Sequence, residues 1–275
     1  MSMLAESIRQ NLENITPIEP REITEVRHKA EQPLFRLCVL IFIVAVITVF
    51  TSDIGDLGVL FILPSIIIFA LYYNYAKARA SAIRVTERNF PEIYYKSIEF
   101  AKKLGMEKVP PVFIEQKNGM LNAFAATIFG RRYAKLNAEL VDVAYMEHKD
   151  FDTVFFVLAH EFGHHYFRHA DFSRILLISL GHLIPVFGTM HSRSMEYSCD
   201  RVAQLLLGRN GVNELMLLSA GRHLYKYVDA EDYLRETKKG NEFLPWFVNL
   251  FATHPIMPKR IAALADPERK SGKLF

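Results

Sequence analysis

Two long apolar runs near the start of the chain limit the folds it can adopt. Leu34–Phe50 and Leu57–Tyr75 are almost wholly apolar, and Arg36 and Pro64 are the main interruptions. Each run approaches the ~20 residues that an α-helix needs to cross a bilayer. The pattern predicts a transmembrane hairpin with a short turn at residues 51–56, in which a proline is tolerated. Two buried core helices are the alternative interpretation.

The residues that flank this hairpin predict its orientation. Some thirty mostly polar residues precede the first run, which argues against a cleaved signal peptide. The turn carries Asp53 and Asp56 but no basic residue, whereas both outer flanks are basic. Because basic loops stay in the cytoplasm, we expect an integral protein of a plasma or inner membrane whose following domain faces the cytoplasm. The basic flanking residues are Arg21, Arg27, Lys29 and Arg36 before the hairpin, and Lys77, Arg79, Arg84 and Arg88 after it.

A second feature predicts chemistry. His160 and His164 are four residues apart, so on a helix they share one face and can bind one metal ion. Glu161 lies beside them and can hold a water against that metal, which is the H-E-x-x-H pattern of zinc hydrolases. The preceding residues 153–159 are apolar on every side and predict a buried helix, which Asp150 and Asp152 can cap.

Catalytic zinc usually takes a third protein ligand. A histidine six residues after His164 would supply one pattern, but Ala170 occupies that position. A glutamate on a later helix is the other option, and Glu196 is the candidate. Asp200 follows on the same helical face, where its carboxylate can accept the second N–H of a zinc-bound histidine. Both could instead be ordinary surface acids.

These motifs together resemble the HtpX-type membrane zinc peptidases and the related CAAX prenyl endopeptidases. Four segments match in the family's order: residues 122–125, the H-E-F-G-H segment at 160–164, the E-Y-S-C-D segment at 196–200, and Thr253-His254-Pro255 followed by Arg260-Ile261. Cys199 is a departure, because the family more often has alanine there.

The resemblance implies roles for further residues. It implies that His160, His164 and Glu196 hold one Zn²⁺, and that Asp200 and Arg260 support the site. It also implies that His254 stabilises the oxyanion. By the same resemblance Asn122, Ala123 and Phe124 bind an extended peptide at a sheet edge. The alternative interpretations, without a functional role, are that Asn122 ends a turn and that His254 is a loop histidine.

The remaining sequence predicts an α+β, mainly helical, zincin-like metallopeptidase domain with a small sheet, preceded by the hairpin. We expect a cytoplasmic segment at 1–33, the hairpin at 34–75, the domain at 80–265 and a tail at 266–275. A helix should begin near Pro91 and end at Gly105, and strands should cover 111–115, 121–129 and 133–136. The net charge of +3 is too small to indicate nucleic acid. Cys38 and Cys199 should stay unpaired.

The apolar run at 175–190 falls short of a full span and contains a proline and two glycines. A buried hairpin, a re-entrant segment and a membrane-surface contact are all open, and a packed hairpin that dips toward the bilayer is favoured. His182 within it reads as a core or interface histidine. His165 and His169 read as polar residues that flank the zinc helix.

The expected function is a membrane-anchored zinc endopeptidase that cleaves membrane or misfolded proteins. A zinc-binding adaptor without proteolysis is a second possibility, although it would not need Glu161. A CAAX-type processing peptidase is a third, but such enzymes usually carry many more spans. A zinc hydrolase of non-peptide substrates is a fourth, which the edge-strand motif disfavours. The expected partners are a protein or peptide substrate and the lipid bilayer.

Overall fold

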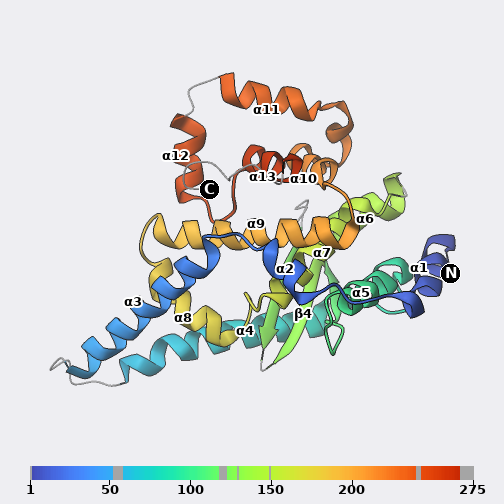
Figure 1. Ribbon diagram of the computed structural model, residues 1–275. Helices are drawn as coiled ribbons and strands as arrows, with labels where there is room; N and C mark the ends of the chain where they lie inside the picture. Colours follow the sequence, from blue (N-terminus) through green and yellow to red (C-terminus); the bar gives the residue numbers. More distant parts are fainter. Residues whose placement is uncertain are drawn as a thin grey trace.

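The computed structural model describes residues 2–51, 58–117, 123–128, 130–148, 150–239 and 243–266. Helices surround a small sheet, and the first two long helices project from one side of the molecule (Figure 1). The helices before the sheet are α1 (Met3–Asn11), α2 (Pro20–Glu25), α3 (Glu31–Thr51), α4 (Val59–Ser81) and α5 (Pro91–Lys103), with a 3-10 turn at Leu12–Asn14.

The helices after the sheet build most of the domain. They are α6 (Ala138–Asp142), α7 (Asp152–Tyr166), α8 (Phe172–His182), α9 (Phe187–Leu207), α10 (Val212–Leu224), α11 (Ala230–Lys239), α12 (Phe243–Phe251) and α13 (Met257–Ala265). A π-helical segment at Val143–His148 and a 3-10 turn at Tyr225–Tyr227 join them. The predicted class, mainly helical with a small sheet after two apolar helices, is confirmed.

The sheet has four strands in the order β1-β2-β4-β3. β2 (Val112–Glu115) pairs in parallel with β4 (Arg131–Asn137), whereas β1 (Ile83–Arg84) and β3 (Ala123–Ile128) pair antiparallel to their neighbours. β3 therefore lies at one edge of the sheet. The three predicted strands are present, and β1 was not predicted because two residues are too few to show an alternating pattern.

The two apolar runs form the helices α3 and α4. Both are long and apolar enough to cross a membrane by length and composition. Leu40, Ile47, Phe61 and Phe69 on these helices are each more than half exposed. α3 begins three residues before the predicted span, and α4 continues six residues past it, because the ends of both helices pack on the domain. The predicted turn between them lies outside the described residues.

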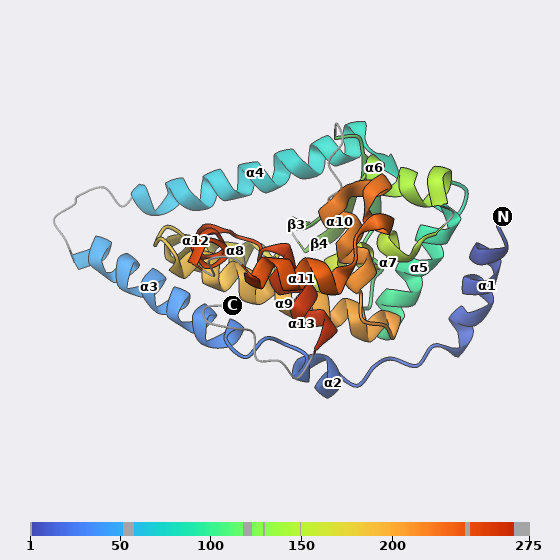
Figure 2. The same ribbon diagram turned by 90° about the horizontal axis from the view of Figure 1, so that it is seen from above.

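The third apolar run is a helical hairpin. It forms most of α8, a turn at residues 183–186 and the beginning of α9. α8 packs against both α3 and α4 and lies between them (Figure 2). His182 Nε2 lies 3.0 Å from His191 Nδ1 on α9, so His182 is an interface histidine as expected. Leu183 in the turn is 76 % exposed, which leaves an apolar tip on this hairpin.

The main core forms around α7, which is buried along nearly its whole length. Gly211, at the start of α10, shows how tightly this helix is packed. A Cβ added there would lie 2.2 Å from the ring of Phe156 on α7, and its φ of +73° disfavours any other residue. Gly208 has a similar φ of +68° but nothing within 4 Å of an added Cβ.

Comparison of alanine variants at Gly211 and Gly208 distinguishes the effect of a steric clash from that of backbone strain. We expect Gly211→Ala to destabilise the protein by about 2 kcal/mol more than Gly208→Ala, since only Gly211 would overpack the core. Thermal melting of the detergent-purified chain checks this, with a difference of roughly 6 °C expected. Equal melting temperatures for the two variants would show that α10 does not pack on Phe156 as described.

Candidate metal centre

Helix α7 positions the two histidines and the glutamate of the H-E-x-x-H pattern. It is apolar and buried on all sides up to the motif, which is why its ligands are held rigidly. The N-cap residue is Phe151, which makes no side-chain cap, so the predicted capping by Asp150 or Asp152 is wrong; Asp150, one residue earlier, accepts a hydrogen bond of 2.8 Å from the Asp152 N–H. Asp152 itself is the first helical residue, and its carboxylate pairs with Arg209 instead.

Helix α9 brings Glu196 and Asp200 to the same place. α7 and α9 pack side by side, and the absence of a side chain at Gly163 permits this close approach. A Cβ at Gly163 would lie 3.2 Å from the Cα of Cys199. Because Glu196 and Asp200 are four residues apart, both point from α9 toward α7. The carboxylates are therefore buried in the core rather than on the surface.

Four ligand atoms of three side chains converge between the two helices. His160 Nε2 lies 3.2 Å from His164 Nε2 and 3.3 Å from Glu196 Oε2. His164 Nε2 lies 3.4 Å from Glu196 Oε1. Ligand atoms at the usual zinc distance of ~2.1 Å, in tetrahedral arrangement, are separated by ~3.4 Å. The three side chains thus fit a single zinc ion.

The outer nitrogen of His160 is bound to a carboxylate. His160 Nδ1 lies 2.8 Å from Asp200 Oδ1. Arg260 donates two hydrogen bonds to the same carboxylate, from Nε to Oδ2 at 2.8 Å and from Nη2 to Oδ1 at 2.6 Å. Because an ionised carboxylate only accepts, His160 Nδ1 carries the proton and its Nε2 lone pair points at the site. Asp200 therefore lies next to the His160 imidazole, and Arg260 lies next to Asp200.

His164 Nδ1 is held by a hydrogen-bonded chain through His169 to Glu31, which is called the relay below. The sequence did not predict this relay. Glu31 Oε1 accepts a hydrogen bond of 2.8 Å from His169 Nε2, so His169 Nδ1 is the acceptor in its 3.0 Å contact with His164 Nδ1. Burial lowers the pKa of His169 to about 3, which keeps it neutral for this role. His164 Nδ1 then donates, and its Nε2 lone pair also faces the site.

Glu31, the first residue of α3, holds this relay in place. Its side chain is fully buried. It accepts hydrogen bonds from Arg174 at 2.9 Å and from Ser198 at 2.5 Å, and it pairs with Arg27. Glu31 precedes an apolar run in the sequence and lies 138 residues from His169, so no local pattern could indicate this contact. The expectation that His169 merely flanks the zinc helix was therefore incomplete.

The electrostatics of the centre favour a cation. Burial opposes a charge on His160, but hydrogen bonds to Asp200 and Glu196 raise the pKa of His160 to about 10. Burial likewise opposes ionisation of Glu196, yet the two histidines hold its pKa well below its usual value. The negative potential that favours a proton here favours a divalent ion as well.

Cys199 is the competing third ligand. Its sulfur lies with the His160 and His164 nitrogens in a group whose atoms are all within 4.8 Å of one another. Burial, and next the carboxylate of Glu196, raise the pKa of the Cys199 thiol well above its usual value. Metals bind the thiolate rather than the thiol. The Glu196 oxygens lie 3.3 Å and 3.4 Å from the Nε2 atoms of His160 and His164, which matches the ~3.4 Å separation of tetrahedral zinc ligands, so the geometry favours Glu196 as the third ligand.

A cavity of about 310 Å³ opens over these residues. It is lined by His160, Glu161, His164, Glu196 and His254, and along one side by residues Ala123–Ala126 of β3. Burial raises the pKa of Glu161, and a backbone hydrogen bond from Ala125 opposes this rise. The edge strand and the glutamate thus lie on one cavity. Ala123 and Phe124 are at this edge, whereas Asn122 lies outside the described residues.

His254 reaches the same cavity from the loop between α12 and α13. Its Nε2 lies 3.6 Å from Glu196 Oε1, and its side chain is 65 % exposed. The structure therefore brings together all the described residues that the sequence singled out for the site. His165 does not join them, because its Nε2 donates to the Tyr133 carbonyl at 3.0 Å, away from the metal ligands.

A buried helix with two histidines and a glutamate, faced by a carboxylate on a second helix, is the arrangement of zinc-dependent hydrolases. The model of peptidase family M48 matches residues 87–184 and 171–268, which together make about two thirds of the chain. The chain therefore belongs to peptidase family M48, which includes the HtpX and CAAX-type zinc metallopeptidases. No curated protein and no solved structure matches it.

The relay through Glu31 is testable by mutation. Glu31→Gln should lower the melting temperature of the detergent-purified chain by roughly 10 °C, because it leaves the buried Arg174 and the half-buried Arg27 without their shared counter-charge. Glu22→Gln on α2, where the glutamate is exposed, is the matched control and should melt like the unmodified chain. A melting temperature for Glu31→Gln equal to that of Glu22→Gln would contradict the relay.

Proposed function

We propose that this chain is a membrane-anchored zinc endopeptidase in which His160, His164 and Glu196 hold the metal. The observation that carries the proposal is the convergence of two histidine lone pairs and one carboxylate at 3.2–3.4 Å separations. Two lone pairs and a negative charge held this close repel one another unless a cation lies between them. The M48 match supports the same assignment, since members of that family are zinc-dependent.

The residues around the metal ligands would then divide the chemistry. Zinc bound there supplies a Lewis acid that lowers the pKa of a water to about 7 and polarises the scissile carbonyl. Glu161 takes the proton of the attacking water and donates it to the leaving amine. Asp200 and the His169–Glu31 pair hold the two imidazoles in one tautomer and orientation. Arg260 in turn fixes Asp200.

His254 is proposed to donate a hydrogen bond to the oxyanion that develops on the substrate carbonyl. Its side chain is mostly exposed beside Glu196, so substrate can reach it. The edge position of β3 supports binding of an extended peptide by backbone hydrogen bonds along Ala123 and Phe124, and the family resemblance gives Asn122 the same role. This binding mode contacts the backbone of the peptide more than its side chains, which suits unfolded or damaged substrates.

Replacement of the proposed general base tests the mechanism. Glu161→Gln should lower cleavage of an unfolded protein such as casein by at least about 100-fold, because it removes proton transfer. Zinc content should stay near one per chain, since the metal ligands are intact. Glu13→Gln, at an exposed position in the N-terminal segment, is the control and should cleave normally. Normal cleavage by Glu161→Gln would rule out this mechanism.

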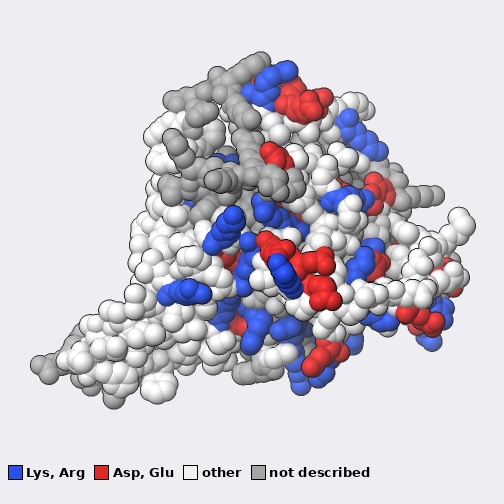
Figure 3. Space-filling view, viewed as in Figure 1, with Lys and Arg blue, Asp and Glu red and all other residues white. Residues whose placement is uncertain are grey.

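The membrane part of the proposal rests on α3 and α4. Their exposed apolar surface forms an uncharged projection, and lysine and arginine gather where it meets the domain (Figure 3). We infer that the hairpin crosses the bilayer and that the catalytic domain faces the cytoplasm, where substrates from the membrane or the cytoplasm meet the site. An adaptor role gains no support, since Glu161 faces the cavity.

This orientation predicts which vesicles expose the domain. Added protease should digest the domain in inside-out membrane vesicles and leave it intact in right-side-out ones, because only the former present the cytoplasmic face. Immunoblotting of the C-terminal half measures the outcome. Protection in inside-out vesicles together with digestion in right-side-out ones would reverse the assigned orientation.

A further inference from the structure

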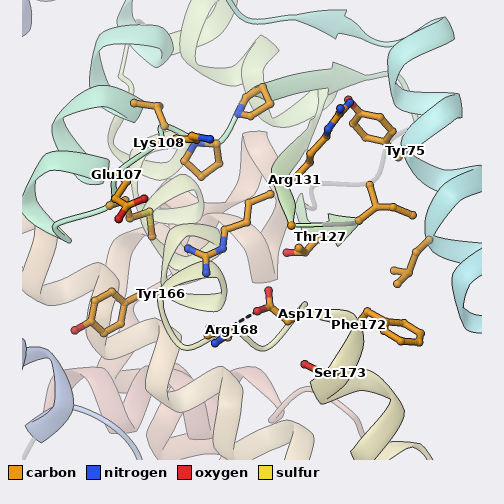
Figure 4. Close-up of a pocket in the computed structure, with 18 of the residues that line it drawn as sticks. Tyr75, Glu107, Lys108, Thr127, Arg131, Tyr166, Arg168, Asp171, Phe172 and Ser173 are labelled. Carbon is orange, nitrogen blue, oxygen red and sulfur yellow. Dashed lines mark hydrogen bonds and ion pairs between the residues drawn. The ribbon is translucent and has the colours of Figure 1, made fainter. Parts of the chain in front are cut away.

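A second and larger cavity lies between α4 and the soluble domain. Its volume is about 1000 Å³, and four segments line it: α4, the loop after α5, the β3–β4 hairpin, and the end of α7 with the turn that leads into α8. Figure 4 shows Lys108 on one side, Tyr75 and Phe172 on the opposite side, and Arg131 and Thr127 between them. None of the proposed metal ligands lines this cavity.

The lining of this cavity is positively charged. Four cationic side chains line it, whereas only two carboxylates do. Arg168 pairs with Asp171 at 2.5 Å. The other three cations have no carboxylate partner among the described residues, and they are Lys108, Arg131 and Arg132. Unpaired positive charges in a concave site focus the field on whatever enters, so the cavity is suited to an anion.

The floor of the cavity carries a polar group that lacks a partner. The Thr127 hydroxyl is buried and makes no hydrogen bond within the described structure. A buried hydroxyl left unpaired costs about 1–3 kcal/mol, so a partner from a bound molecule would be favourable. Phe172 and Ser173, the first residues of α8, line the same cavity, and a helix N-terminus favours negative charge.

One wall of the cavity is apolar and belongs to a candidate membrane helix. Ile68, Leu71 and Tyr75 of α4 lie on one helical face by their spacing, and Phe172 lines the same side of the cavity. The neighbouring Phe69 and Tyr72 on α4 are 69 % and 57 % exposed, so the apolar wall continues onto the surface that would meet lipid. An apolar wall beside a cationic floor matches a molecule with an anionic head and hydrocarbon chains.

We propose that this cavity binds one anionic phospholipid of the surrounding membrane. Its phosphate would lie beside Lys108, Arg132 and the Thr127 hydroxyl, since Thr127 and Arg132 face each other on one side of the β3–β4 pair, and its acyl chains would run along α4. The inference rests on the membrane anchoring in the proposed function, and not on its peptidase chemistry. Thr127 follows Ala123–Ala126 on β3, so the lipid would contact the same strand that lines the metal cavity.

Lipid retention by the purified chain tests the proposal directly. Native mass spectrometry of the full chain in neutral detergent, titrated with dioleoyl phosphatidylglycerol or dioleoyl phosphatidylcholine, measures affinity for each. We expect the unmodified chain to prefer phosphatidylglycerol by at least about tenfold. The triple variant Lys108→Gln, Arg131→Gln, Arg132→Gln should lose that preference. The control variant Arg9→Gln, Arg21→Gln, Arg88→Gln removes the same charge elsewhere and should keep it.

A milder variant guards against misfolding of the triple variant. Thr127→Val keeps the shape of the side chain and removes only the hydroxyl, so it should weaken phosphatidylglycerol binding several-fold without lowering the melting temperature. Equal preference in the two triple variants, or unchanged affinity in Thr127→Val, would overturn the site. So would complete displacement of the lipid by millimolar inorganic phosphate, because the cavity would then take phosphate rather than lipid.

The lipid result is independent of proteolysis. The same titration on Glu161→Gln should give the unmodified affinity, because Glu161 lines the metal cavity and not this one. If the unmodified chain cleaves casein but shows no preference for phosphatidylglycerol, the lipid site is rejected and the peptidase proposal stands. Preserved preference with no cleavage by the unmodified chain would support the lipid site while the peptidase proposal failed.

Discussion

The close packing of α7 on α9 is the contact on which the rest of the site depends. α7 supplies both histidines, and α9 supplies the carboxylate that completes the ligand set. Their backbones approach because Gly163 has no side chain where it meets Cys199. A wider separation would move Glu196 away from both imidazoles, so the tight contact at Gly163 contributes to the ligand distances. The glycine inside the H-E-x-x-H motif thus favours the close approach of the two helices that carry the metal ligands.

Two buried carboxylates on opposite sides of the centre fix the histidines. Asp200 binds His160 directly, whereas Glu31 acts on His164 through His169. Asp200 is neutralised by Arg260, and Glu31 by Arg27 and Arg174. Each buried negative charge therefore has its own cation, which lowers the cost of burial. Glu31 also ties the start of an apolar helix to the metal centre, so the anchor and the site form one packed unit.

The features that could be predicted from the sequence are those that depend on patterns within one segment. Apolar length indicated α3 and α4, four-residue spacing placed His160 and His164 on one face, and the same spacing placed Glu196 and Asp200. Contacts between distant segments left no such signal. Glu31 meets His169 only after the chain has folded, and the cavity beside α4 gathers residues from four segments. Charge and periodicity in one segment cannot show which other segment will face it.

X-ray absorption at the zinc edge of the purified full chain tests the central claim most directly. The account predicts only nitrogen and oxygen neighbours at about 2.0–2.2 Å, with the multiple-scattering signature of two imidazoles. A sulfur neighbour at about 2.3 Å would place Cys199 on the metal in place of Glu196. That result would contradict the ligand set on which the proposed mechanism is built.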